Sequence, residues 1–110
     1  MTVIIGIDPG FSGAIAHLSS NGTLEIRDMP IVADLKGRSV LNLYDLHELF
    51  SPKAEEEHVA VLEQVASRPG QSAPSTFRFG QGYGALEMGL AAHKIPKRTV
   101  TPAKWKKYFG

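Results

Sequence analysis

Two apolar runs in this chain each lead directly into a carboxylate. Residues 3–7 read Val-Ile-Ile-Gly-Ile and are followed by Asp8, and residues 58–62 read His-Val-Ala-Val-Leu and are followed by Glu63. Runs of this length and composition are typical of buried strands. A buried carboxylate is costly unless a cation or a hydrogen-bonded turn accompanies it. The pattern predicts that one sheet brings both acids to a shared cation site, although either acid could instead cap a turn or a helix.

The bulk composition indicates one globular domain. The chain has 110 residues, of which 43% are hydrophobic, and it contains no cysteine. No apolar run approaches the roughly 20 residues of a membrane-spanning helix, and no signal peptide is recognisable at the N-terminus. We therefore expect a single domain over residues 1–110, located in the cytoplasm and without a membrane partner.

Charge is distributed unevenly along the chain. No acid follows Glu87, whereas the same stretch holds half of the twelve basic residues, namely Lys94, Lys97, Arg98, Lys104, Lys106 and Lys107. A basic segment of this kind could contact phosphate. It could equally be a solvated tail whose acidic counterparts lie elsewhere in the sequence.

The first 28 residues predict an antiparallel meander with strands at 2–8, 13–18 and 23–28. Asn21-Gly22 between two apolar runs predicts a hairpin with a type I′ turn, because both residue types tolerate positive φ. Residues 29–40 predict a loop, with a short strand near 39–41. The acids at 55–57 are expected to be a solvated approach to the next strand, because three consecutive residues cannot share one face.

The second half predicts helices alternating with strands. A helix is expected after the N-cap Asn42 and ends near Phe50, with His47 as a surface residue. A polar loop at 67–74 precedes a long helix over 75–93, then a strand over 97–101 and a helix that begins at Pro102.

The long helix contains four glycines, at positions 80, 82, 84 and 89. Each weakens a helix by up to about 1 kcal/mol relative to alanine, so a compensating role is expected. Gly80 and Gly84 lie one turn apart and would let another backbone or a nucleic-acid strand approach closely. Residues 80–85 also match a dinucleotide-binding fingerprint, but the match lies inside a helix and no acid follows about 20 residues later, which argues against a nucleotide cofactor.

Taken together, three segments resemble the RuvC-type Holliday junction resolvases, especially the short phage-borne ones, within the ribonuclease H-like superfamily. The segments are Gly-Ile-Asp-Pro-Gly at 6–10 with Gly13, Leu-Glu-Gln-Val at 62–65, and Phe-Gly-Gln-Gly-Tyr-Gly at 79–84. The resemblance implies an α/β fold with a ribonuclease H-like mixed five-stranded sheet, in which an antiparallel three-strand meander precedes parallel strands and helices flank the sheet.

The resemblance also implies a function. Asp8 and Glu63 would be two of four acidic residues that hold two Mg²⁺ ions, or Mn²⁺ in their place, in a structure-selective endodeoxyribonuclease. One ion would activate water and the other would stabilise the leaving 3′ oxygen. The substrate would be branched DNA, a four-way junction. Two matched nicks imply a homodimer, for which the helix over 75–93 is the candidate surface, unless its small residues pack on this chain's own sheet.

The sequence departs from the family pattern in its acids. The family's remaining acids lie on a C-terminal helix beyond the fifth strand, and this chain has no acid after Glu87. We therefore expect residues 1–110 to be an N-terminal portion that lacks this helix, binds metal weakly and cleaves little. The alternatives are a non-catalytic protein that binds DNA junctions and, with less support, a fragment of an actin-like or sugar-kinase-type ATPase, which shares the first strand motif.

Candidate DNA contacts surround the acidic tips. They are Gln64, Arg68, Arg78, Gln81, Lys104, Lys106 and Lys107, which could contact the phosphates of converging duplex arms. Family members often place an aromatic residue shortly after the glutamate, whereas this chain has Ala66 and Ser67 there. Phe77 and Phe79 are expected to lie in the core or at a dimer interface.

Overall fold

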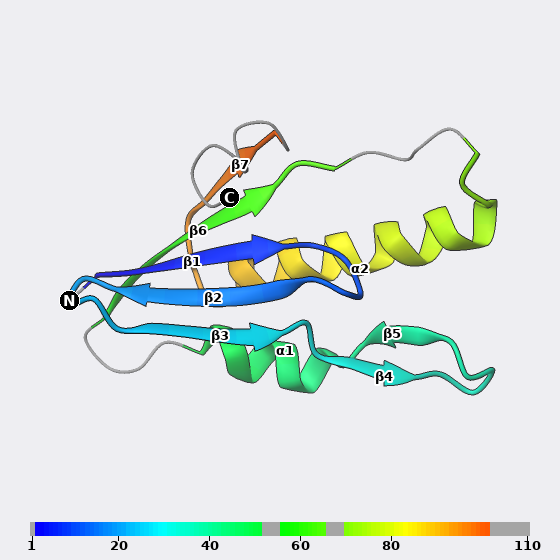
Figure 1. Cartoon of the computed structure of the whole chain (residues 1–110), viewed down its shortest axis with the longest axis horizontal. Coiled ribbons are helices and arrows are strands. Elements are labelled where there is room, and N and C mark those ends of the chain that lie inside the picture. Colours follow the sequence, from blue (N-terminus) through cyan, green and yellow to red (C-terminus); the bar gives the residue numbers. More distant parts are fainter. Residues whose placement is uncertain (1, 52–55, 66–69, 102–110) are drawn as a thin grey trace.

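The chain folds around a mixed five-stranded sheet. The computed structural model describes residues 2–51, 56–65 and 70–101, and the sheet has the strand order β3-β2-β1-β6-β7 (Figure 1). Its strands are β1 (Thr2–Asp8), β2 (Ala14–Ser19), β3 (Leu24–Asp28), β6 (Glu57–Glu63) and β7 (Lys97–Val100). β1, β2 and β3 form the antiparallel meander, and β6 lies parallel to both β1 and β7. The predicted α/β architecture is confirmed.

Two helices cover one face of this sheet. The helices α1 (Leu43–Phe50) and α2 (Ala73–Ala92) both pass behind the strands in Figure 1. They supply four side chains to the single buried core, Leu46, Phe50, Leu86 and Leu90. The sheet supplies alternate residues, among them Ile5, Ile7, Ile15 and Leu62, because successive side chains of a strand point to opposite faces. The helices approach each other closely at Gly89, where a Cβ atom would lie 2.9 Å from the Phe50 ring.

The opposite face of the sheet carries exposed apolar side chains. Ile4 on β1 pairs with Leu18 on β2, which pairs with Leu24 on β3, and these three side chains are 38–55% exposed. Ile26 on β3 is 66% exposed. Within the described ranges no helix packs on this face. The sheet therefore carries apolar side chains on both faces, but the described helices cover only one of them.

The turn between β2 and β3 differs from the prediction. Gly22 has a positive φ of 90°, but Asn21 does not, so the turn is not type I′. Instead, Ser20, Asn21 and Gly22 form a three-residue loop closed by hydrogen bonds from Gly22 N to Ser19 O and from Ser19 N to Thr23 O. The Asn21 side chain accepts a hydrogen bond from Thr23 N. A type I turn followed by one left-handed residue needs positive φ only at the glycine.

Most of the loop predicted over residues 29–40 instead forms a separate β-hairpin. The strands β4 (Ile31–Ala33) and β5 (Ser39–Leu41) pair antiparallel as a separate two-stranded sheet. The strand near 39–41 was expected, but its partner was not. Three residues are too few to show an alternating pattern, and the pairing depends on a turn that Asp34 organises. The expected loop is therefore wrong for this segment.

The helix starts follow capping side chains. Asn42 accepts a hydrogen bond from Asp45 N, which confirms the predicted N-cap of α1. α2 begins earlier than the predicted residue 75, because Ser72 caps it by accepting a hydrogen bond from Ser75 N. The helix expected from Pro102 lies outside the described residues. None of the described helices is long and apolar enough to cross a membrane.

The pH dependence of stability is expected to involve His17 on β2. Its Nε2 donates to the carbonyl oxygen of Leu49 at 3.1 Å and so ties the end of α1 to the sheet. Burial lowers the pKa of His17 below its ordinary value of 6.5, with smaller lowering effects from His58 and Arg27, while the bond to Leu49 and the charge of Glu25 oppose the shift.

The unfolded chain then binds more protons than the folded one below pH 6.5, so stability should be lost as the pH falls through that value and retained above it. We expect His17→Gln to flatten the slope of unfolding free energy between about pH 7.5 and about pH 5.5 in urea titrations. Leu24→Ser, on an exposed β3 side chain, is the control and should retain the wild-type slope. An unchanged slope in His17→Gln would contradict this assignment.

Candidate metal and nucleic-acid site

The tip of β1 is held by a close backbone approach. Asp8 ends the strand, and the chain turns through Pro9 and Gly10 so that Gly13 returns against it. Gly13 N donates to Gly10 O at 3.0 Å, and Gly13 O accepts from Met29 N at 3.0 Å. A Cβ atom on Gly13 would lie 2.0 Å from the carbonyl oxygen of Asp8. Only glycine fits there, so the position of Asp8 depends on that residue.

The two predicted acids lie at the same end of neighbouring strands. The parallel register pairs Ile7 with Leu62, so Asp8 and Glu63 occupy the next step of the same ladder. Because Ile7 and Leu62 are both buried toward the helices, the alternation of side chains assigns both acids to the opposite face. Neighbouring strands are about 4.8 Å apart, a spacing at which two carboxylates can share one cation. The register thus brings Asp8 and Glu63 to the same end of adjacent strands, and a cation shared between them stays a prediction.

A third acid lies in the same row and was missed from the sequence. Asp28 ends β3 and pairs with Ala14, which in turn pairs with Asp8. The row across the sheet edge therefore runs from Asp28 through the small side chain of Ala14 to Asp8 and then Glu63. Asp28 is two strands, or about 10 Å, from Asp8, so it adds negative potential without sharing the same ion. Asp28 ends the strand predicted over 23–28, and this feature of the sequence could have marked it as a third candidate acid.

The donor set suits a hard divalent cation. Carboxylate oxygens are the ligands that Mg²⁺ and Mn²⁺ prefer, and Asp8 is exposed to solvent at the strand tip. Among residues 2–51, 56–65 and 70–101, no group of three or more His, Cys, Asp or Glu side chains is placed to hold one ion. A divalent ion held by Asp8 and Glu63 would therefore have two protein ligands from the described residues and would leave most coordination positions to water or substrate.

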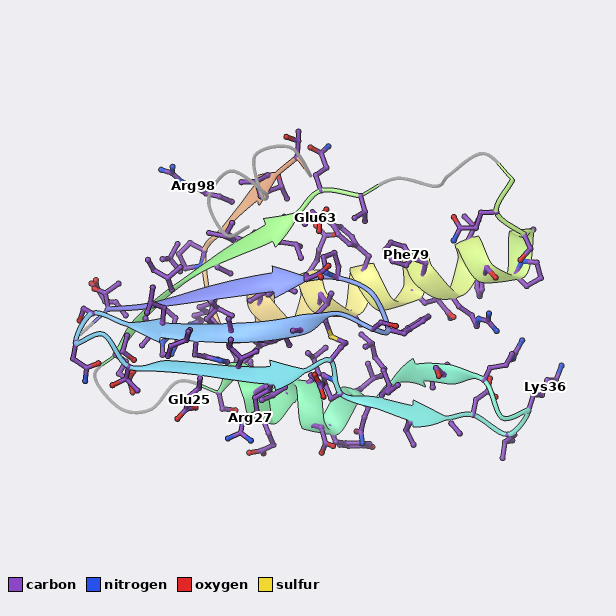
Figure 2. All side chains as sticks on the ribbon, in the orientation of Figure 1. Glu25, Arg27, Lys36, Glu63, Phe79 and Arg98 are labelled. Atoms are coloured by element: carbon purple, nitrogen blue, oxygen red, sulfur yellow. The ribbon has the colours of Figure 1, made fainter. Side chains whose placement is uncertain are left out.

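Tyr83 on α2 lies close enough to Glu63 at the end of β6 for the two groups to interact electrostatically. Burial raises the pKa of Tyr83 above its ordinary value, and the carboxylates of Glu87 and Glu63 raise it further. The phenol therefore stays protonated at neutral pH and can serve as a hydrogen-bond donor. Tyr83 lines a small cavity together with Pro9, Gly10 and Phe79, beneath the turn that follows Asp8 (Figure 2 labels Phe79 and Glu63).

The predicted DNA contacts fall into separate groups. Gln64 is exposed directly after Glu63, and its N–H donates to Val100 O, which holds the end of β6 against β7. Arg78 and Gln81 line a groove of about 470 Å³ between α2 and the β5 hairpin, with Phe11 and Leu43 on its other side. The remaining predicted contacts lie outside the described residues, namely Arg68, Lys104, Lys106 and Lys107.

Arg78 contributes a positive charge to the lining of this groove. Its Nε atom is buried and has no hydrogen-bond partner among the described residues. A buried guanidinium nitrogen without an acceptor is costly. Phe77, expected in the core or at an interface, is 66% exposed and so does not belong to the core of this chain.

Comparison with solved structures identifies the fold. The chain aligns with Thermus thermophilus RuvC in complex with a Holliday junction substrate at a TM-score of 0.60 and 13% sequence identity, over 97% of this chain and 69% of that chain. The chain has a RuvC-like fold. A second Thermus thermophilus RuvC structure aligns at a TM-score of 0.48 and 19% identity, over 96% of this chain and 67% of that one. Protein-family models and curated proteins give no match.

The RuvC-like fold agrees with the ribonuclease H-like architecture that the motifs implied. At 13% identity the alignment is evidence for the fold alone. The features that bear on function are therefore the row of acids at the sheet edge and the groove between α2 and β5.

Proposed function

We propose that this chain belongs to a structure-selective endodeoxyribonuclease that acts on four-way DNA junctions, in the manner of a Holliday junction resolvase. The observation that carries the proposal is the placement of Asp8 and Glu63 on adjacent parallel strands of a RuvC-like sheet. Asp8 and Glu63 would hold Mg²⁺ or Mn²⁺, which would supply activation of water and stabilisation of the leaving oxygen in phosphodiester hydrolysis. A cytoplasmic location remains a prediction.

The chain's own residues would contribute positioning and charge. Gly13 keeps Asp8 against its turn, and the hydrogen bond from Gln64 N to Val100 O keeps the Glu63 tip in the sheet. Arg78 and Gln81 would bind backbone phosphates in the groove between α2 and β5. Complete coordination of two divalent ions takes more carboxylates than the described residues bring to that edge, so we expect weak metal binding and little cleavage from residues 1–110.

A binding and cleavage assay tests the proposal. A labelled four-way junction and a linear duplex of equal length are titrated with the 110-residue chain in Ca²⁺ for binding, and then incubated in Mg²⁺ or Mn²⁺ for cleavage. Selective binding of the junction supports the proposal. Equal affinity for junction and duplex, or no binding to either, would count against it. Selective binding without any cleavage, even after addition of a chain segment that supplies further acids, would favour the non-catalytic junction-binding alternative.

We also propose that α2 is the surface of a homodimer. Phe77, Gly80, Gly84 and Met88 lie three or four residues apart and so share one helix face. Phe77 and Met88 are 66% and 65% exposed, and a Cβ atom on Gly80 or Gly84 would meet no other described residue within 4 Å. The two glycines therefore do not pack on this chain's own sheet, which was the alternative explanation for them.

Alanine substitutions at Gly80 and Gly84 separate their effect on the stability of α2 from their effect on dimerisation. In the monomer, Gly80→Ala and Gly84→Ala should each stabilise α2 by up to about 1 kcal/mol, because the added methyl groups point into open space. If a partner helix packs there, the same substitutions should weaken dimerisation about tenfold or more in sedimentation measurements.

Gly82→Ala is the matched control. Its Cβ atom would make ordinary contacts with Phe11 and Leu41 at 3.5–3.7 Å on the groove side of the helix, so dimerisation should be unaffected. A dimer that tolerates Gly80→Ala and Gly84→Ala without loss of affinity would place the interface elsewhere.

A further inference from the structure

The β4–β5 hairpin has a tip whose conformation is determined by one side chain. Asp34 Oδ1 accepts hydrogen bonds from Lys36 N at 2.8 Å and Arg38 N at 2.9 Å, and Oδ2 pairs with Arg38 Nε at 2.9 Å. The backbone closes the same turn through Asp34 N to Arg38 O and Gly37 N to Asp34 O, with Gly37 at a φ of 79°. The hydrogen bonds from Arg38 N and Lys36 N hold the pKa of Asp34 below its usual range, so it stays ionised at neutral pH.

This ordered turn presents an apolar and a basic side chain to solvent. Leu35 is fully exposed, at 108% of the reference area, and Lys36 beside it is also exposed. Because Leu35 buries no area against the described part of the chain, its whole side chain is available for contact with a ligand. Five hydrogen bonds that rigidify the turn reduce the entropy cost of a contact made by its apex.

The hairpin lies at the end of the molecule that carries the acids. In Figure 1, β4 and β5 extend beyond the ends of β1 and β6, toward the same side as the N-terminal end of α2. Figure 2 shows Lys36 at the outermost point of the hairpin. The base of the hairpin is anchored, because Leu41 and Val40 line the groove with Arg78 and Asn42 N donates to Pro30 O at 2.9 Å.

From this arrangement we infer that the β4–β5 hairpin is a second DNA-contacting element, in which Lys36 binds a backbone phosphate and Leu35 inserts against a base step of a junction arm. The inference rests on the proposed function and extends it to a surface beyond the strand ends that carry the acids. DNA is the occupant that the tip fits, because apolar wedges flanked by cations are a recurring way to unstack a base step. A protein partner would require about 800 Å² of contact per side, whereas the apex offers one apolar side chain.

Matched substitutions test the two roles separately on the 110-residue chain. Leu35→Ser should weaken binding of the four-way junction in Ca²⁺ about fivefold to tenfold, and should abolish the fluorescence increase of 2-aminopurine placed at successive steps of each arm. Lys36→Gln should weaken binding to junction and duplex alike and should reduce the slope of log affinity against log salt by about one. Asp34→Ala should reproduce the Leu35→Ser effect, because it releases the turn, and Asp34→Asn should restore most of the affinity.

Two controls lie on β3, away from the hairpin tip. Leu24→Ser removes an exposed apolar side chain, and Arg27→Gln removes one positive charge from the same strand, so both should bind the junction as the wild type does. Thermal unfolding confirms that each variant is folded.

The outcomes distinguish this inference from the proposed function. Wild-type binding of the junction that is unchanged in the Leu35 and Lys36 variants would overturn the hairpin's role and leave the nuclease proposal intact. Absence of junction binding by the wild type would overturn both. A change of oligomeric state in Leu35→Ser with unaltered DNA affinity would assign the apex to a protein contact and so overturn the inference.

Discussion

Gly13→Ala is expected to destabilise the chain by about 3 kcal/mol, because the added methyl group overlaps backbone that cannot move independently. The Cβ atom would lie 2.0 Å from Asp8 O and 3.0 Å from Asp8 C, and Gly13 also receives the hydrogen bond from Met29 N that joins β3 to the turn. A loss of this size is a large fraction of the roughly 5–15 kcal/mol that stabilises a domain. Urea unfolding followed by circular dichroism measures it.

Gly10→Ala is the control for this prediction. Gly10 lies in the same turn, yet a Cβ atom there would meet nothing within 4 Å, and its φ is not positive. We expect a change within about 0.5 kcal/mol. Equal stability of Gly13→Ala and Gly10→Ala would mean that the turn can open without cost, and the explanation for the position of Asp8 would then be wrong.

The second large effect is expected at the acids themselves. Asp8→Asn and Glu63→Gln should each weaken Mn²⁺ binding at least about tenfold, measured by calorimetry or by electron paramagnetic resonance of free Mn²⁺, because each removes one of the two proposed charged ligands. The same variants should bind the junction about twofold to threefold more tightly without divalent ions, because a negative charge beside the phosphates is gone. Any Mn²⁺-dependent nicking by the wild type should disappear.

Asp28→Asn supplies the matched control for charge. It removes one carboxylate from the same row of the sheet, but at about 10 Å from Asp8 it is too far to share an ion with Glu63. Mn²⁺ affinity should therefore change by less than about threefold through the electrostatic potential alone. Loss of Mn²⁺ binding in Asp28→Asn that equals the loss in Asp8→Asn would require a different ligand set at this edge.

Much of the fold could be predicted from local patterns. The apolar run before Asp8 and the one before Glu63 are short, β-branched and bounded by turn residues, so they predict strands whichever partners they find. Asn42 caps α1 because its side chain reaches Asp45 N within its own turn, an interaction that depends on three residues of sequence alone. The sequence identifies Gly13 as a turn residue. Its close approach to Asp8 O could not be predicted, because it depends on the conformation of the whole turn.

Other features depended on pairing between distant segments. The strand β4 has only three residues, which is too short for a periodic pattern to predict it. Its structure depends on pairing with β5 and on the hydrogen bonds of Asp34. Asp28 could not be connected with Asp8 from the sequence, because the link runs through the register of β2 with both neighbours. The buried Nε of Arg78 likewise depends on the packing of α2 beside β5.

The sequence by itself determined which acids are candidates for the site, because a carboxylate that follows a buried strand is placed by local periodicity. Only the tertiary structure decided which of those residues meet. Adjacency of Asp8 and Glu63 requires that β1 and β6, separated by about fifty residues, pair in parallel with Ile7 opposite Leu62. A shift of one residue in that register would move one acid to the helix-covered face, so the site exists through pairing and packing that no local pattern encodes.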